Sequence, residues 1–141
     1  MKILDPKNGS LRISDCSVIT QETVLQEIVD LFGVDQVKIV DHTNGCQTVS
    51  VPNILISEYW FCFSFEFRNN LLYGIRIVLD EKEFSGGWET WSEAEEMRRL
   101  TLCEKWLYQQ TRRSEPHFSW GNIQTLYDSK GGFASIMLKY E

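Results

Sequence analysis

The clearest pattern along this 141-residue chain is an alternation of aromatic and smaller side chains. Every second position over residues 59–67 carries an aromatic ring, and apolar residues alternate again over residues 71–79. A period of two places these side chains on one face of a strand. Asn69 and Asn70 between the two runs tolerate positive φ and suit a tight turn. The pattern predicts a β-hairpin, and strand 59–67 is expected inside a sheet because so apolar a strand would aggregate at an edge.

Shorter patterns predict further strands before and after this hairpin. Residues 37–40 and 48–51 are mostly apolar or β-branched, and Pro52 is expected to end the second strand or to mark an edge. The first 13 residues contain a turn sequence between two apolar stretches, which predicts an N-terminal hairpin. Residues 118–140 predict a final hairpin, with a bulge at Trp120-Gly121.

Two segments have the signals of helices. Residues 21–32 carry an apolar stripe of helical period, with Thr20 as the expected N-cap and Gly33 beyond the last turn. Residues 92–112 contain neither Gly nor Pro, and Ser92 with Glu95 has the spacing of a capping box. We therefore expect one α+β domain over residues 1–141, a mostly antiparallel β-sheet covered by two α-helices.

Composition adds an expectation about location. The chain is 43% hydrophobic and 24% charged, as in ordinary globular proteins. The first residues lack the apolar core of a signal peptide, and no stretch approaches the roughly 18 apolar residues that span a membrane. We expect a cytoplasmic protein that does not contact membranes.

The net charge of −6 is unevenly distributed. Residues 80–96 alone sum to −6, because they hold seven acids and only the base Lys82. An acidic surface disfavours direct binding to nucleic acid and complements a basic protein partner. The predicted partner-binding residues are Asp80, Glu81, Glu83, Trp88, Glu89 and Trp91.

These residues also have simpler interpretations. Asp80, Glu81 and Glu83 are expected in a solvated loop, and acids at the start of helix 92–112 favour the helix dipole. Trp88 and Trp91 either fold over the core or stand exposed as interface anchors. A carboxylate pair in this segment would instead suit an enzyme.

Common catalytic motifs are absent from the sequence. His42 and Cys46 have a spacing that two metal ligands can have, but further ligands would have to come from distant positions. We expect no catalytic residue, metal or cofactor, and four free cysteine thiols because no CxxC pair occurs.

The segment FSWGNIQTLYDSKGGFASIMLKY, the opening ILDPKNGSLRIS and the start of helix 92–112 at Trp88, Trp91 and Ser92 resemble a group of small bacterial proteins. Small acidic proteins of this kind resemble immunity proteins of polymorphic and contact-dependent growth-inhibition toxins. The resemblance implies binding and neutralisation of a cognate toxin domain, often a nuclease, and transfers no functional residue. The alternatives are an enzyme that uses carboxylates and a small-ligand-binding or structural subunit. The oligomeric state is left open.

Overall fold

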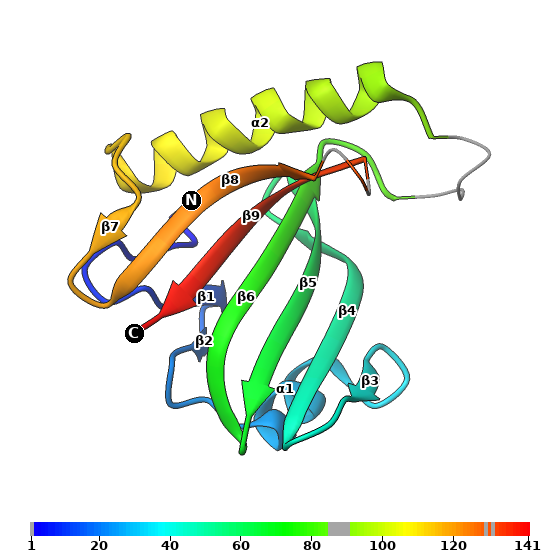
Figure 1. The fold of residues 1–141 in the computed structure, drawn as a ribbon, viewed down its shortest axis with the longest axis vertical. Coiled ribbons are helices and arrows are strands. Elements are labelled where there is room, and N and C mark those ends of the chain that lie inside the picture. The colour runs from blue at the N-terminus through cyan, green and yellow to red at the C-terminus, as the bar shows by residue number, and fades with distance from the viewer. Residues whose placement is uncertain (1, 85–90, 129, 131) are drawn as a thin grey trace.

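A computed structural model describes residues 2–84, 91–128, 130 and 132–141. Seven strands form one sheet in the order β3-β4-β5-β6-β9-β8-β7, and every neighbouring pair is antiparallel. A separate two-stranded sheet pairs β1 with β2 near the N-terminus. Figure 1 shows the arrangement of these strands and the two helices. The bounds are β1 Leu11–Ser14, β2 Ser17–Ile19, α1 Leu25–Phe32, β3 Lys38–Asp41, β4 Cys46–Ile56, β5 Tyr59–Arg68, β6 Leu71–Asp80, α2 Glu93–Thr111, β7 His117–Phe118, β8 Gly121–Asp128 and β9 Phe133–Tyr140.

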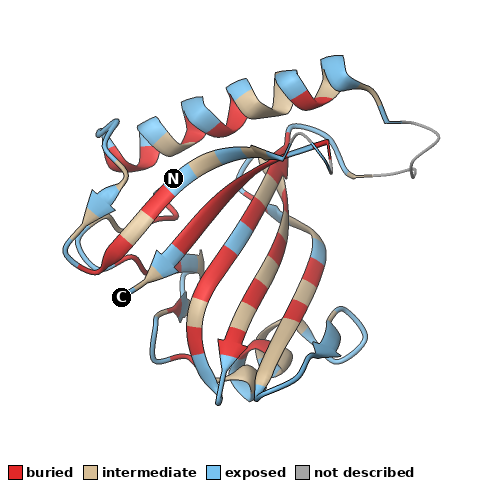
Figure 2. Cartoon of the chain, viewed as in Figure 1, coloured by how far each residue is buried: buried red, intermediate tan, exposed pale blue. Residues whose placement is uncertain are grey.

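The predicted β5–β6 hairpin is confirmed. The strands pair in antiparallel register through Phe63 and Ile77, and the turn residues Asn69 and Asn70 have φ angles of 51° and 63°. Buried bands alternate with less buried ones along both strands (Figure 2). The strand β5 lies between β4 and β6, so its aromatic run is not at an edge.

The two helices confirm the α+β class but lie at opposite ends of the sheet (Figure 1). The long helix α2 packs against β6, β8 and β9, and Trp106 meets Phe61 of β5 edge-on at 5.7 Å between ring centroids. The short helix α1 contacts β4, and its Phe32 ring lies about 6 Å from the rings of Phe63 and Phe65. Neither helix of the described chain has both the length and the apolar content needed to cross a membrane.

The predicted start of the first helix is wrong by several residues. The helix α1 begins at Leu25, and Thr20 caps only the preceding turn, where its hydroxyl accepts a hydrogen bond from Glu22 N. The first helical N–H groups have other acceptors, because Glu27 accepts from Val24 N and Asn70 accepts from Leu25 N. The Asn70 contact comes from the β5–β6 turn, so no local sequence signal could predict it. In the second helix, the Ser92 hydroxyl accepts a hydrogen bond from Glu95 N, which confirms the predicted N-cap of α2.

Pro52 does not end its strand. The strand β4 continues to Ile56 past a bulge between Val51 and Ile54, where Asn53 has a φ of 51°. The strand β3 pairs with β4 only as far as Ser50, and Pro52 lies in the bulge, where it has no partner in β5 either, so it lacks no ladder hydrogen bond. The prediction that Pro52 marks an edge therefore holds locally.

Two side-chain hydrogen bonds connect the C-terminal segment to the N-terminal turn. The Trp120 indole donates to the Pro6 carbonyl at 2.9 Å, and the Tyr140 hydroxyl donates to the Gly9 carbonyl at 2.7 Å. Gly121, with a φ of 153°, lies so close to β9 that a Cβ atom there would collide with the Lys139 carbonyl oxygen. The bulge predicted at Trp120-Gly121 is not found, because β8 pairs with β9 without a register shift from Gly121 onward, but Gly121 does permit a close backbone approach.

The expectation that Asp80 lies in a solvated loop is wrong. Asp80 is the last residue of β6 and is 1% exposed. Its carboxylate accepts hydrogen bonds from Arg98 at 3.0 Å and from Arg99 at 2.8 Å. Arg99 also bonds to Glu96, which is 2% exposed and accepts a hydrogen bond from Ala134 N of β9. Together, these contacts attach the first half of α2 to β6 and β9 through the side chains of Asp80, Glu96, Arg98 and Arg99.

The arginines also set the protonation of Asp80. Burial by itself would raise the pKa of this carboxyl, but hydrogen bonds from Arg99 and Arg98 outweigh burial and hold the pKa below its ordinary value of 3.8. Asp80 is therefore ionised in the folded protein at neutral pH. A depressed carboxyl pKa stabilises the fold above the unfolded-state pKa and ceases to do so as the pH falls through the folded-state value.

We predict that Asp80→Asn lowers the free energy of unfolding by about 3 kcal/mol at pH 7, because two arginines lose their buried counter-charge. Urea denaturation would measure the change. Glu83→Gln, on an exposed side chain three residues beyond the end of β6, serves as the control and should change stability by less than about 0.5 kcal/mol.

Wild type and Asp80→Asn should also differ in how their stability depends on pH. The stability difference between wild type and Asp80→Asn should be full well above the ordinary carboxyl pKa of 3.8. It should shrink as the pH falls below that value, because the unfolded chain binds the proton first, and it should be lost once the pH falls through the lower pKa of folded Asp80. A difference that stays constant down to acid unfolding would contradict the assigned role of the carboxylate charge.

A second substitution tests the close approach at Gly121. We predict that Gly121→Ala destabilises the protein by more than about 3 kcal/mol, because the added methyl group meets the β9 backbone. The control is Gly33→Ala, where φ is also positive at 94° but a Cβ has no neighbour within 4 Å, so a loss of about 1 kcal/mol is expected. Equal losses in thermal or urea unfolding would contradict the steric account.

Candidate functional site

In the acidic segment predicted to bind a partner, contacts with the rest of the fold hold Phe84 and Trp91 in place. After Asp80, the backbone of Phe84 forms two hydrogen bonds with the Asn53 side chain, at 2.9 and 3.0 Å. The Arg99 guanidinium lies 5.1 Å from the Phe84 ring centroid. Before α2, the Trp91 indole donates to the Gly132 carbonyl at 2.8 Å. The bulge in β4 and the β8–β9 turn therefore hold the two ends of this segment.

The six predicted binding residues have different surroundings. Glu81 and Glu83 are exposed, and the Glu81 side chain is 70% exposed with a long 3.9 Å contact to Arg98. Trp91 is 38% exposed, which leaves part of its ring available while its N–H is occupied. Asp80 is buried, as described above, and Trp88 and Glu89 lie outside the described residues.

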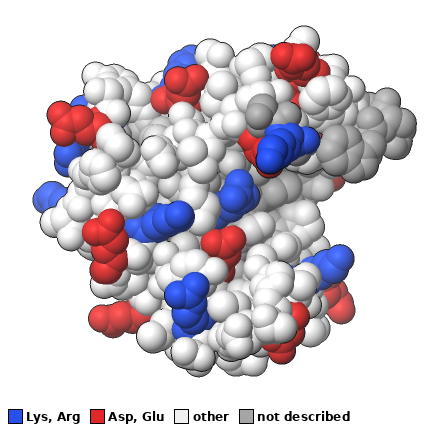
Figure 3. Space-filling view, in the orientation of Figure 1, with Lys and Arg blue, Asp and Glu red and all other residues white. Residues whose placement is uncertain are grey.

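Arginines just after the acidic segment reduce its charge. Residues 80–96 sum to −6, but Arg98 and Arg99 bring residues 80–99 to −4 and fold back onto the acids. Glu95 bonds to Arg98 at 3.1 Å, and this hydrogen bond, with the charge of Arg98, lowers the pKa of Glu95. Two of the acids counted in the sequence, Asp80 and Glu96, are therefore buried and hold α2 against the sheet. On the face drawn in Figure 3, acidic and basic side chains are interspersed.

A second acidic surface lies at the other end of the molecule and was missed in the sequence. Residues 20–41 hold five acids and one base, a net charge of −4, and all six side chains are exposed. Three exposed apolar side chains lie among them: Val34 at 74%, Ile39 at 46% and Val40 at 39%. We call this region the α1–β3 surface; its charged members are Glu22, Glu27, Asp30, Asp35, Lys38 and Asp41. A count of charge in successive windows of the sequence would have found this acidic region. It was overlooked because the residues outside 80–96 together have a net charge of zero.

The strand β3 gives this surface an open sheet edge. It is the first strand in the sheet order, it pairs only with β4, and all four of its residues are exposed. Peptide groups on the outer side of an edge strand are available to another chain. Figure 1 shows α1 and β3 at the same end of the sheet.

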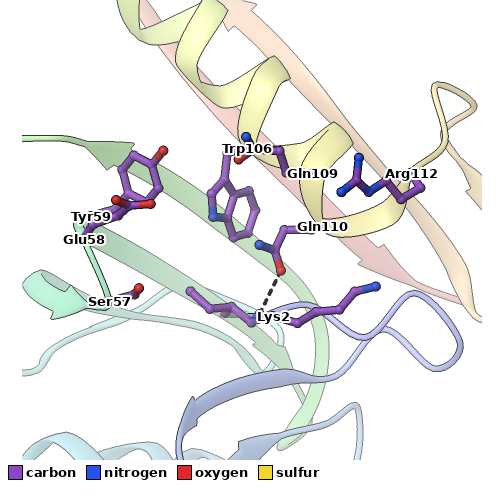
Figure 4. A pocket seen from close by; sticks show the side chains of 9 residues that line it. Lys2, Ser57, Glu58, Tyr59, Trp106, Gln109, Gln110 and Arg112 are labelled. Carbon is purple, nitrogen blue, oxygen red and sulfur yellow. Dashed lines mark hydrogen bonds between the residues drawn. The ribbon is translucent and has the colours of Figure 1, made fainter.

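A polar hollow of about 290 Å³ lies where the end of α2 approaches the β4–β5 turn and the N-terminal residues. Figure 4 shows its side chains, with Glu58 and Arg112 on opposite sides of Trp106 and Gln110. Burial, followed by the charges of Glu58 and Glu81, raises the pKa of Tyr59, so this phenol remains a neutral donor. The lining includes Ser57, Glu58, Tyr59, Trp106, Gln110 and Arg112.

The residues considered as metal ligands have other contacts. The His42 ring nitrogen Nε2 lies 2.9 Å from the Thr48 hydroxyl, and the Cys46 thiol faces the Asn44 carbonyl at 4.0 Å. Within the described ranges, no three His, Cys, Asp or Glu side chains are grouped as a metal site. All four cysteines are free thiols, and burial raises the pKa of Cys103 to about 12.

Comparison with protein-family models, with curated proteins and with solved structures found no match to this chain.

Proposed function

We propose that this chain is a non-catalytic protein that binds and neutralises a basic toxin domain in the bacterial cytoplasm. The observation that supports it is the α1–β3 surface, which combines excess acidic charge, exposed apolar side chains and an open strand edge. The proposal keeps the partner class expected from the sequence. It places the main contact at a different surface.

The three features of this surface support different parts of recognition. The net charge of −4 speeds encounter with a basic surface and disfavours acidic partners. Val34, Ile39 and Val40 provide apolar area that a partner can remove from water. The open edge of β3 can pair with an extended segment of the partner, whose backbone would continue the sheet. A basic extended segment satisfies all three requirements.

The acidic segment between β6 and α2 is a second contact surface under the same proposal. Glu81, Glu83 and the exposed part of Trp91 remain available there, while Asp80 belongs to the fold. Its arginine neighbours weaken its attraction for a basic partner, so we rank it below the α1–β3 surface.

The alternative in which carboxylates of this segment catalyse a reaction has less support. Asp80 and Glu96 are buried and held by arginines, and the depressed pKa of Asp80 makes it a poor proton donor near neutral pH. A glycosidase-like pair would need two carboxyl groups that face an accessible substrate.

The test begins with toxin domains encoded beside this gene. We predict that one of them binds this chain and loses its toxicity upon co-expression. The double reversal Asp35→Lys/Asp41→Lys should slow association about tenfold at low salt and by less at high salt, because the long-range attraction is removed. Stopped-flow or surface-based kinetics at two salt concentrations would measure this.

The matched control is Glu81→Lys/Glu83→Lys, which changes the charge equally on the other surface and should alter the rate less than about threefold. Both variants replace exposed side chains and should fold normally. If the control slows association more than Asp35→Lys/Asp41→Lys does, the partner contacts the acidic segment instead of the α1–β3 surface. If no neighbouring toxin domain binds the wild-type chain, the proposed function is wrong.

A further inference from the structure

We propose that Asn44, in the turn between β3 and β4, is a site of spontaneous deamidation, where the side-chain amide is converted to a carboxylate. The sequence contains an Asn-Gly pair twice, at residues 8–9 and 44–45. A glycine after asparagine leaves the backbone nitrogen that carries out this reaction unhindered, because it has no Cβ atom. The two pairs have different surroundings: contacts hold the first pair, whereas the second pair is exposed.

The reaction joins two neighbouring groups of the chain. The backbone nitrogen of Gly45 loses its proton and forms a bond to the side-chain carbonyl carbon of Asn44, and the side-chain nitrogen leaves as ammonia. Water then opens the resulting cyclic imide at either of its carbonyl groups. The product is an aspartate or an isoaspartate, and the isoaspartate has an additional methylene group in the backbone. The reaction therefore needs a free backbone N–H, a free side-chain amide and a turn that can rearrange.

The turn at residues 44–45 meets these requirements. Asn44 and Gly45 are exposed and have φ angles of 60° and 77°. Within the described residues, neither the Asn44 side-chain amide nor the Gly45 N–H forms a hydrogen bond. The hydrogen bond that closes the turn, from Cys46 N to the Thr43 carbonyl, is long at 3.3 Å. Asn69 N donates to the Gly45 carbonyl at 2.9 Å, which leaves the Gly45 nitrogen free to react.

The same dipeptide at residues 8–9 is held at both reacting groups. The Asn8 Oδ1 atom accepts hydrogen bonds from the Ser10 backbone N–H at 3.0 Å and from the Ser10 hydroxyl at 2.7 Å. The Gly9 N–H donates to the Asp5 carbonyl at 2.8 Å. Gly9 is also buried, and its carbonyl accepts a hydrogen bond from the Tyr140 hydroxyl at 2.7 Å. Ring closure at Asn8 would break several of these bonds, so this site should react slowly.

Deamidation of Asn44 would change the α1–β3 surface, which lies at the same end of the molecule (Figure 1). Residues 20–44 hold five acids and the base Lys38, a net charge of −4, and a sixth acid would bring the net charge to −5. An isoaspartate would also lengthen the backbone of the turn that holds β3 against β4. The effect on a basic partner rests on the proposed function, whereas the reaction itself does not.

Peptide mapping by mass spectrometry tests the proposal on the full chain, incubated in its folded state in mildly alkaline buffer. Deamidation replaces an –NH₂ group by –OH, and fragmentation assigns the mass increase to one residue. We expect Asn44 to react more than about tenfold faster than Asn8, because the contacts of Asn8 must first open. Asn44→Gly removes the amide and suits the positive φ, so it should abolish this modification and leave the rate at Asn8 unchanged.

The unfolded chain provides the matched control. In concentrated guanidinium chloride both Asn-Gly pairs lose their contacts, so their two rates should become comparable. Comparable rates in the folded protein, or a faster reaction at Asn8, would overturn the proposal. It would also be overturned if Asn44 stayed intact in the folded chain for as long as both sites take to react in the unfolded chain.

The consequence for binding is measured separately. Asn44→Asp reproduces the added charge without the isoaspartate and should speed association with a basic partner at low salt, by less than about threefold. If no toxin domain binds the chain, the proposed function fails and the deamidation result stands. If a partner binds but Asn44 does not deamidate, the modification fails and the proposed function stands.

Discussion

The fold depends on burying the apolar face of the β5–β6 hairpin. The strand β5 alone presents Phe61, Phe63, Phe65 and Phe67 on one face, and each is at most 2% exposed. Such an area of aromatic surface cannot remain in water, and its burial provides the main favourable term in folding. Residues from distant parts of the chain belong to the same core cluster: the N-terminal residues, α1 and α2. The polar contacts described above hold these segments in place.

This constraint explains why acidic residues of one sequence segment have different roles. The end of β6 meets the first half of α2, where the approach of two backbones excludes water from Asp80 and Glu96. Buried carboxylates require hydrogen-bonding counter-charges, and Arg98 and Arg99 provide them. Glu81 and Glu83, one and three residues further on, are exposed. The charge that can attract a partner is therefore smaller in this segment than its sequence indicates. Among exposed side chains of the described residues, the α1–β3 surface carries the larger acidic excess.

The sequence predicted correctly those elements that depend on residues close together in the chain. The two-residue period from Tyr59 to Leu79 predicted paired strands, and Ser92 with Glu95 predicted the start of α2. The start of α1 was predicted too early. Glu27, which accepts from Val24 N, was a local signal that was overlooked, whereas the Asn70 contact with Leu25 N comes from a turn distant in sequence. The burial of Asp80 was missed for the same reason, since its partners lie 18 and 19 residues away and the contact depends on how α2 packs. The hollow around Trp106 was also beyond sequence reasoning, because it needs the N-terminal backbone beside Gln110.

The central functional claim is that a basic partner contacts the α1–β3 surface. Hydrogen–deuterium exchange of the complex with the neighbouring toxin domain would test it most directly, because amide protection maps an interface residue by residue. Contact at this surface should slow exchange in β3 and the preceding turn, over residues 34–41, with little change at residues 81–84. Unchanged exchange over residues 34–41 in a saturated complex would contradict it.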